Sequence, residues 1–102
     1  MAVLVITTNI PGPPDAERPD MYDRVTAEIE AENTAIDGLI IHTAGYLDGE
    51  WTVTDVWESA EAHQKFRDER LFPAIKKVSG MDPAGGPQAT VKVHELHNYI
   101  KP

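Results

Sequence analysis

The dipeptide Asp48-Gly49 constrains this chain more than any other feature, because it predicts a tight β-hairpin. A two-residue type I′ turn needs positive φ at both central positions, which favours Asp-Gly between β-rich segments. The flanking segments, 38–47 and 50–59, are rich in β-branched and aromatic residues. The sequence therefore predicts two antiparallel strands joined at this turn.

The turn also fixes the pairing, because residues equally distant from it lie opposite each other. Counting outward gives these opposed pairs: Tyr46 with Trp51, Ala44 with Val53, His42 with Asp55, and Ile40 with Trp57. Side chains alternate between the faces of a strand, so His42, Asp55 and Trp57 are expected on one face. Trp51, next to the turn, is expected in a rim or structural role. An odd loop length would instead send His42 to the opposite face.

Two helical segments flank the hairpin. Pro19 suits the first turn of a helix. Three apolar residues at i, i+3 and i+7 form the stripe of this helix: Tyr22, Val25 and Ile29. Ser59 suits the N-cap of a second helix over about residues 60–71. Pro73 breaks or kinks this helix, and the short turn that follows is expected to end at Gly80.

The remaining segments complete one domain over residues 1–102. A β-branched run at 3–8 predicts a first strand, and a last strand is expected over about 89–99. The proline-rich segment 10–15 breaks regular structure between the first strand and the first helix. The order strand, helix, strand, strand, helix, strand is typical of the α+β ferredoxin-like βαββαβ fold, in which helices cover one face of a four-stranded antiparallel sheet.

The other face of this sheet is expected to need a cover. On the hairpin it carries mostly apolar and threonine side chains: Leu39, Ile41, Thr43, Thr54 and Val56. Burying even ~400 Å² at about 25 cal/mol per Å² contributes ~10 kcal/mol before the costs of association. A homodimer that seals two such sheets against each other is therefore expected.

Charge and composition exclude several classes of partner. The net charge is −8, from 17 acidic and 9 basic residues without a basic stripe, so nucleic acid and anionic membranes are unfavourable partners. The absence of cysteine excludes thiolate nucleophiles and cysteine-ligated metals. The chain shows neither a signal peptide nor an apolar run of roughly 20 residues, so a cytoplasmic protein is expected.

Several motifs resemble the dimeric α+β barrel superfamily, and within it the antibiotic-biosynthesis-monooxygenase-like domains. The resemblance spans nearly the whole chain and rests on the element order, the transition Asp55-Val-Trp-Glu-Ser59, and the segment 66–74. It is closest to small actinobacterial-type members with Gly38-Leu-Ile-x-His-x-Ala-Gly45 and a final His97-Asn98. The resemblance implies a dimeric barrel whose cavity lies between sheet and helices, with Trp57 pointing into it.

The chain departs from two activities of this superfamily. Quinone-forming monooxygenases tend to have an asparagine where this chain has Val53, and a tyrosine where it has His63. Haem-degrading members tend to have an asparagine where this chain has Ile6, and a proximal histidine near positions 66–68. The resemblance therefore supports the fold more strongly than either activity, and haem degradation least.

The opposed pair His42–Asp55 is the candidate base. Directly opposed residues have Cβ atoms about 4.5–5.5 Å apart, so the carboxylate can accept a hydrogen bond from an imidazole N–H. Such a contact fixes the tautomer and leaves the other ring nitrogen as a general base. This base could convert a phenolic or enolic substrate into an anion that reacts with O2. The alternative interpretation is a structural pair, in which the two side chains only satisfy each other's hydrogen-bonding groups within the sheet.

Other candidates have two interpretations each. Trp57 could form a pocket wall or fill the core. His63 could lie at the cavity edge, although a surface position is favoured, and Tyr22 could cap the cavity or fill the core. His97 is a second-rank site residue; because it and His94 have opposite parity on the last strand, no metal site is predicted.

The predicted function is a small homodimeric, cofactor-independent, monooxygenase-like enzyme that acts on a small planar or enolisable molecule. His42 would be the base, Asp55 its orienting partner and Trp57 a pocket wall. Two alternatives remain open: a non-catalytic ligand-binding or structural homodimer, and an isomerase or cyclase that uses the same base. A cavity of roughly 300 Å³ or more beside Trp57 would favour an enzyme, and a filled core would favour the non-catalytic alternative.

Overall fold

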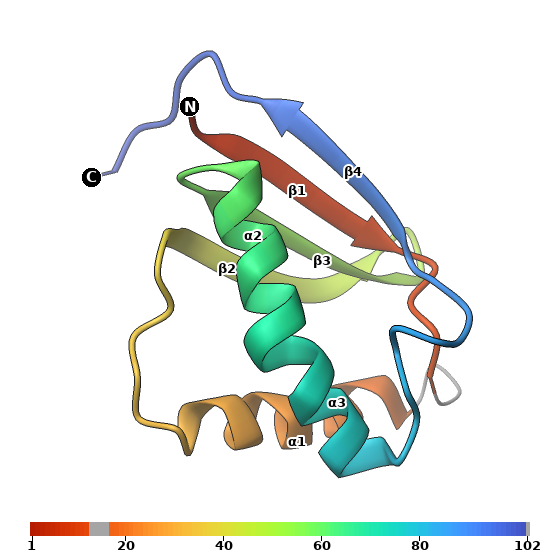
Figure 1. Ribbon diagram of the computed structural model, residues 1–102. Helices are drawn as coiled ribbons and strands as arrows, with labels where there is room; N and C mark the ends of the chain where they lie inside the picture. Colours follow the sequence, from red (N-terminus) through yellow and green to blue (C-terminus); the bar gives the residue numbers. More distant parts are fainter. Residues whose placement is uncertain (13–16, 102) are drawn as a thin grey trace.

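The computed structural model describes residues 1–12 and 17–101 (Figure 1). The elements follow the predicted order: β1 (Val3–Thr8), α1 (Arg18–Glu30), β2 (Leu39–Leu47), β3 (Glu50–Trp57), α2 (Ala60–Phe66), the π-helical turn η2 (Arg67–Leu71), α3 (Phe72–Ser79) and β4 (Thr90–Glu95). The predicted break at 10–15 falls partly on residues 13–15, which lie outside the described residues.

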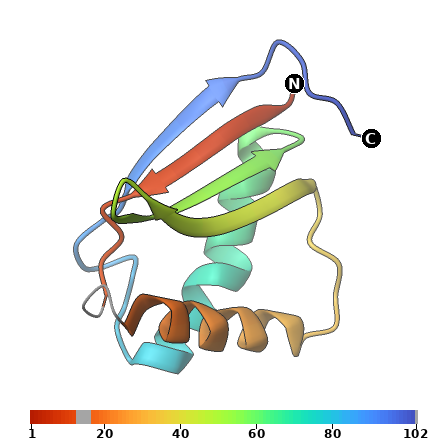
Figure 2. The same ribbon diagram turned by 180° about the vertical axis from the view of Figure 1, so that it is seen from behind.

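The strands form an antiparallel sheet in the order β2-β3-β1-β4. Both α1 and the α2–α3 segment lie on one face of this sheet (Figures 1 and 2). Val3 and Val5 of β1 are buried under the helices together with Trp57. A second cluster, Val25 and Ile29 with Ala74 of α3, joins the helices to each other. The architecture is the predicted α+β ferredoxin-like fold.

The hairpin register is confirmed near the turn and wrong at its far end. Asp48 and Gly49 have φ of 51° and 79°, as a type I′ turn requires, and the three pairs nearest the turn form as predicted. A β-bulge between Leu39 and Ile41 then shifts the register, so that Leu39 rather than Ile40 opposes Trp57. A bulge re-aims the side chains beyond it. Leu39 therefore packs against the core instead of lying on the open face.

The second helix continues through Pro73 with a change of pitch. Phe72 N–H donates to the carbonyl of Arg67, five residues earlier, which widens the helix into the π-turn. Pro73 lacks an N–H but is tolerated because it lies in the first turn of α3. Gly80, with φ of 77°, ends α3 as predicted, and its N–H bonds the carbonyl of Lys76. The expected break at Pro73 is therefore a local change from α-helix to π-helix within a continuous helical segment.

Two regions of the sheet are exposed: the face away from the helices, and strand β4 at one edge. On the face away from the helices lie apolar side chains from three strands: Leu4, Ile6, Ile41, Leu47 and Val56. Ile41 and Leu47 are 53% and 61% exposed. Strand β4 ends at Glu95, earlier than predicted, and every residue of it is exposed. Among the described residues, no helix has the length and apolarity needed to cross a membrane.

Candidate active site

His42 and Asp55 form the pair that the hairpin predicts. Their positions are opposed in the β2–β3 register, and the Nδ1 atom of His42 lies 2.6 Å from Oδ1 of Asp55. Asp55 is buried, at 6% exposure, while the His42 side chain is about one-third exposed. An ionised carboxylate only accepts hydrogen bonds, so His42 carries its proton on Nδ1. A buried acceptor thus holds the imidazole of His42, while part of the ring remains exposed to solvent.

Trp57, on the same strand, donates the second hydrogen bond to the carboxylate of Asp55. Its Nε1–H donates to Oδ2 of Asp55 over 3.2 Å, so each carboxylate oxygen has a donor. The two residues are spaced i, i+2 on β3, which places them on one face. Sequence reasoning placed both residues on this face but missed the hydrogen bond, for which the i, i+2 spacing was the available signal.

Tyr22 contacts His42 from the opposite side. Helix α1 places the Tyr22 hydroxyl 2.6 Å from Nε2 of His42, and the two rings stack with centroids 5.7 Å apart. With Nδ1–H engaged by Asp55, Nε2 is the acceptor, so the hydroxyl donates to it. The four side chains therefore form a continuous Tyr–His–Asp–Trp network from α1 into the sheet.

The space beside Trp57 is filled by side chains. Trp57 is 1% exposed, with the rings of His63 and Phe66 at centroid distances of 5.6 and 5.3 Å. Neither of the two pockets described below is lined by Trp57 or His42. Trp57 therefore lies in the core, and among the described residues neither of these two pockets opens beside it.

His63 lies inside the molecule rather than on the surface. It is 8% exposed on α2 and meets Trp57 edge to face. Burial lowers the pKa of His63 below its usual 6.5; Arg67 lowers it further, whereas Asp55 and Asp68 act in the opposite direction. The expectation of a surface histidine is wrong, because the sheet-facing side of α2 includes position 63 together with Phe66.

The other histidines lie away from this network. His94 is exposed on β4, and His97 is exposed beyond the end of that strand, which stops before it. In the part of the chain that the structure describes, no group of three or more His, Cys, Asp or Glu side chains is arranged to hold a metal ion.

The residues at the position of a proximal haem ligand do not fit a haem iron. Phe66 packs against Trp57, and Arg67 lies over the ring of Phe72 while its Nε donates to Asp68. None of the side chains at 66–68 is an imidazole that could bind iron.

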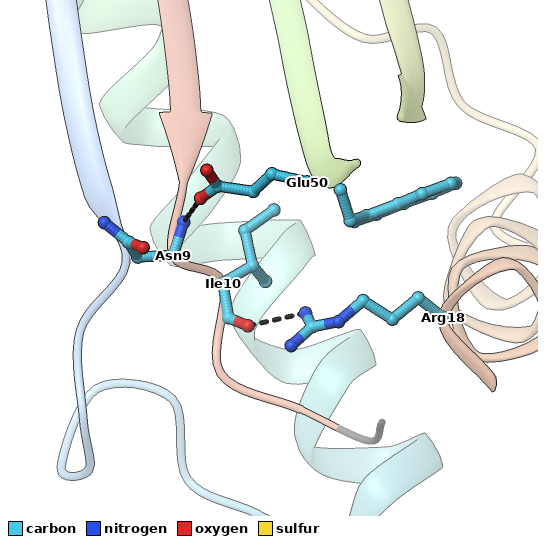
Figure 3. A pocket seen from close by; sticks show the side chains of 5 residues that line it. Asn9, Ile10, Arg18 and Glu50 are labelled. Atoms are coloured by element: carbon cyan, nitrogen blue, oxygen red, sulfur yellow. Dashed lines mark hydrogen bonds between the residues drawn. The ribbon is translucent and has the colours of Figure 1, made fainter. Parts of the chain in front are cut away.

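A pocket of about 250 Å³ lies at the other end of β3 from Trp57 (Figure 3). It is lined by Asn9, Ile10, Arg18, Glu50 and Trp51, and is called the Trp51 pocket below. Sequence reasoning placed Trp51 at a rim but did not identify this pocket, because its wall combines the end of β1 with the start of α1. A second pocket, of about 230 Å³, lies between segment 34–37 and the α2–η2 helix.

The sequence matches no protein-family model and no curated protein. The structure resembles a proposed antibiotic biosynthesis monooxygenase from Caulobacter crescentus, with TM-score 0.61 and 15% identity over 95% of this chain and 90% of that one. It also resembles SnoaB, a cofactor-independent oxygenase from Streptomyces nogalater, with TM-score 0.58 and 14% identity over 97% and 95%. A third similar structure is the haem degrader MhuD from Mycobacterium tuberculosis, with TM-score 0.56 and 20% identity over 99% and 100%. Over nearly its whole length, the chain has the fold of the antibiotic biosynthesis monooxygenase-like proteins.

Proposed function

We propose that this protein is a cofactor-independent, monooxygenase-like enzyme in which His42 is the general base toward a small planar or enolisable molecule. The observation that carries the proposal is the Tyr–His–Asp–Trp network, with hydrogen bonds of 2.6 Å on both nitrogens of His42. The shared fold with SnoaB, which is a cofactor-independent oxygenase, supports the same chemistry. No metal or cofactor takes part in the proposed steps.

In this proposal the network provides a route for the proton. Asp55 holds the Nδ1–H of His42, so the lone pair of Nε2 points at the Tyr22 hydroxyl. A substrate proton passes to the oxygen of Tyr22 while the hydroxyl proton moves to Nε2. The imidazolium that forms is stabilised by the buried carboxylate of Asp55. His42 is thus the base, and Tyr22 is the group that meets the substrate.

The substrate anion then reacts with O2, which is the only oxidant needed. The carbanion supplies the electron pair of a new C–O bond, and the peroxide oxygen takes the proton back from His42. The second hydrogen on the same carbon then leaves as a proton while the O–O bond breaks, so that water departs and a carbonyl group remains. One oxygen atom enters the product and the other leaves as water, and the substrate carbon supplies all the electrons.

The proposal can be tested with 2-tetralone, an enolisable bicyclic ketone. Hydrogen–deuterium exchange at its α-carbon, followed by NMR, reports proton abstraction directly, and oxygen uptake reports oxygenation. Asp55→Asn keeps an acceptor for Trp57 but donates its amide N–H to Nδ1, which forces the proton of His42 onto Nε2. We expect exchange to fall by as much as about 10⁴-fold.

The matched control for this variant is Glu61→Gln, the same carboxylate-to-amide change at an exposed position of α2 outside the network. It should leave exchange within about twofold of wild type, since exposed substitutions away from the site are near neutral. Full exchange activity in folded Asp55→Asn and His42→Ala would overturn the role of the pair as base.

The role of Tyr22 is tested by Tyr22→Phe, with Tyr46→Phe as its control. Both tyrosines meet the edge of Trp51, at centroid distances of 5.7 and 5.1 Å, but only Tyr22 bonds His42. Loss of a proton-transfer group lowers the rate by about 10²–10⁴-fold. We expect that loss for Tyr22→Phe alone, and equal rates for the two variants would remove Tyr22 from the proton route.

A second candidate function is a non-catalytic ligand-binding or structural homodimer, with the network serving only the fold. The filled core around Trp57 and the complete hydrogen bonding of Asp55 favour it. In that case His42→Ala lowers stability and wild-type protein shows no exchange above buffer. Exchange without oxygen uptake would instead indicate an isomerase or cyclase that uses the same base.

We further propose that a second copy of the chain covers the open face of the sheet. Ile41 and Tyr46 are similarly exposed on β2, at 53% and 50%, but their side chains lie on opposite faces. Ile41→Asp should therefore shift the protein from dimer to monomer in light-scattering chromatography, and Tyr46→Asp should not. A monomeric wild-type protein would contradict the proposal.

A further inference from the structure

We propose that Tyr22 is a redox-active tyrosine, which gives one electron through Trp51 to an oxygen-centred radical while its hydroxyl proton passes to His42. This inference goes beyond the proposed function, because it requires neither a bound substrate nor turnover. It assigns a role to the ring contact between Tyr22 and Trp51, which the proposed proton route does not use.

The hydrogen bond of the Tyr22 hydroxyl is suited to the coupled loss of an electron and a proton. A phenol that loses an electron becomes a strong acid, so its oxidation is much easier where a base takes the proton at the same time. The proton moves only across a short hydrogen bond. The hydroxyl oxygen of Tyr22 lies 2.6 Å from Nε2 of His42, which is at the short end of the hydrogen-bond range. Tyr22 therefore has a proton acceptor already in place.

His42 is held so that it can keep the proton that it receives. Its Nδ1–H donates to Oδ1 of Asp55 over 2.6 Å, which leaves Nε2 as the acceptor for Tyr22. The imidazolium that forms faces the carboxylate of Asp55, which is 6% exposed, and a buried carboxylate stabilises a positive charge more strongly than one in water. The proton therefore stays beside the oxygen that released it and can return when the tyrosyl radical is reduced.

Trp51 provides the electron with a route to solvent. Its indole meets Tyr22 edge to face, with ring centroids 5.7 Å apart, which is a normal contact distance for two aromatic rings. Electrons pass readily between rings in contact. Trp51 is only half-buried and lines the Trp51 pocket, where a small oxidant can reach it. An indole can lose an electron without first losing its proton, so Trp51 can relay the electron without a base of its own.

The redox step balances with one radical and one proton from water. The oxidant takes an electron from Trp51, and an electron from Tyr22 restores Trp51. The O–H bond of Tyr22 breaks as its proton forms an N–H bond at Nε2 of His42. An organic peroxyl radical that takes the electron, together with a proton from water, becomes a hydroperoxide. A reductant such as ascorbate then returns an electron to Tyr22, and the proton moves back from His42.

The other two tyrosines of the chain lack this combination of contacts. Tyr46 also meets Trp51, at a centroid distance of 5.1 Å, but both ring nitrogens of His42 are already bonded to Tyr22 and Asp55. Tyr99 is 43% exposed beyond the end of β4, and in the described part of the chain no tryptophan ring meets it. Tyr22 is therefore the one tyrosine that both contacts Trp51 and bonds His42.

The radical can be located in the full chain by flash photolysis. Photogenerated ruthenium(III) tris(bipyridine) serves as the one-electron oxidant, and EPR of freeze-quenched samples identifies the radical. Replacement of Tyr22 by 3-fluorotyrosine, introduced by amber suppression, adds a splitting from the fluorine nucleus if the radical lies on this ring. We expect the splitting with the label at position 22 and not with the same label at position 46. A splitting from position 46, or a persistent tryptophan radical instead of a tyrosyl radical, would overturn the proposal.

The role of His42 as proton acceptor is tested by His42→Gln, which keeps an acceptor for the Tyr22 hydroxyl but takes up no proton. Tyrosyl formation, followed by transient absorption, should slow by about 10²-fold or more, as expected for the loss of a positioned base. His97→Gln is the matched control, at an exposed position beyond β4. The wild-type protein should also form the radical more slowly in D2O, a measurement that does not depend on how the variant folds. Equal rates for wild type and His42→Gln, or in H2O and D2O, would exclude coupled proton transfer.

The electron route and the class of oxidant are tested with peroxyl radicals released from a water-soluble azo initiator. Wild type and Tyr46→Phe should show the tyrosyl signal, and Tyr22→Phe and Trp51→Phe should lose it. A signal that persists in Trp51→Phe would exclude the relay, and a wild-type signal with ruthenium(III) alone would exclude peroxyl radicals as the oxidant. These experiments contain no substrate, so they are independent of the proposed function. If Tyr22→Phe lowers α-proton exchange but no radical forms on Tyr22, the proposed function stands and the redox role is wrong.

Discussion

Trp51 and Trp57 stand at opposite ends of β3 on the same face of the sheet, yet their surroundings differ. Trp57 is 1% exposed, bonds a buried carboxylate and is covered by side chains of α2. Trp51 is only half-buried, meets two tyrosines at their edges and borders a pocket. The difference shows that the helix lying over a residue, rather than its strand position, decides whether a tryptophan fills the core or lines a site.

The largest effect is expected from truncating each tryptophan in turn. Trp57→Ala removes the largest fully buried side chain and should lower the free energy of unfolding by about 3–5 kcal/mol. Trp51→Ala loses mainly its contacts with Tyr22 and Tyr46, at about 0.5–1.5 kcal/mol each. Urea unfolding of both variants measures the contrast, and equal losses would mean that the two ends of β3 are equally packed.

The glycines beside the two tryptophans sharpen the same contrast. Gly38 and Gly49 both have positive φ, at 81° and 79°, so alanine strains the backbone at either position by about 1–2 kcal/mol. A Cβ at Gly38 would also lie 2.6 Å from Cβ of Ala62, whereas a Cβ at Gly49 meets nothing within 4 Å. We expect Gly38→Ala to cost about 1–3 kcal/mol more than Gly49→Ala.

The double variant Gly38→Ala/Ala62→Gly isolates that clash, because it removes the opposing methyl group. Its destabilisation should be smaller than the sum of the two single changes, as measured in a urea double-mutant cycle. Strict additivity would show that the backbone conformation of Gly38, rather than its packing against α2, accounts for the cost.

Much of the fold follows from local signals in the sequence. Asp48-Gly49 determines the register near the turn, so the opposition of His42 and Asp55 could be counted from the sequence. The bulge at Leu39 could not be counted, because it depends on how the strand meets the core formed by Val3, Val5 and Trp57. Register arithmetic is therefore dependable close to the turn and fails with distance from it.

Only the part of the candidate site that lies within one hairpin could be predicted from the sequence. His42 and Asp55 lie on neighbouring strands joined by a two-residue turn, so their contact is local. Tyr22 of α1 reaches His42, and Arg18 of α1 reaches the carbonyl of Ile10; both contacts depend on how a helix docks on the sheet. The docking of α2 likewise buries His63 against Trp57. Long-range placement of this kind is decided by packing, which periodicity does not specify.

The smallest effect is a pH dependence at the Trp57 end, where His63 is buried. Burial lowers the pKa of His63 below 6.5, so the unfolded chain binds its proton more readily than the folded protein does. Stability should therefore fall as the pH drops through 6.5 toward the lowered folded-state pKa, with this histidine contributing at most about 1.4 kcal/mol per pH unit. His63→Gln removes that contribution, whereas His97→Gln, at an exposed position beyond the end of β4, should retain it. Urea unfolding between about pH 7.5 and 5 measures the free energy of unfolding of wild type and His63→Gln, and the other titrating groups cancel in the difference. If the two free energies depend on pH in the same way, the proton reaches His63 without opening the packing around Trp57.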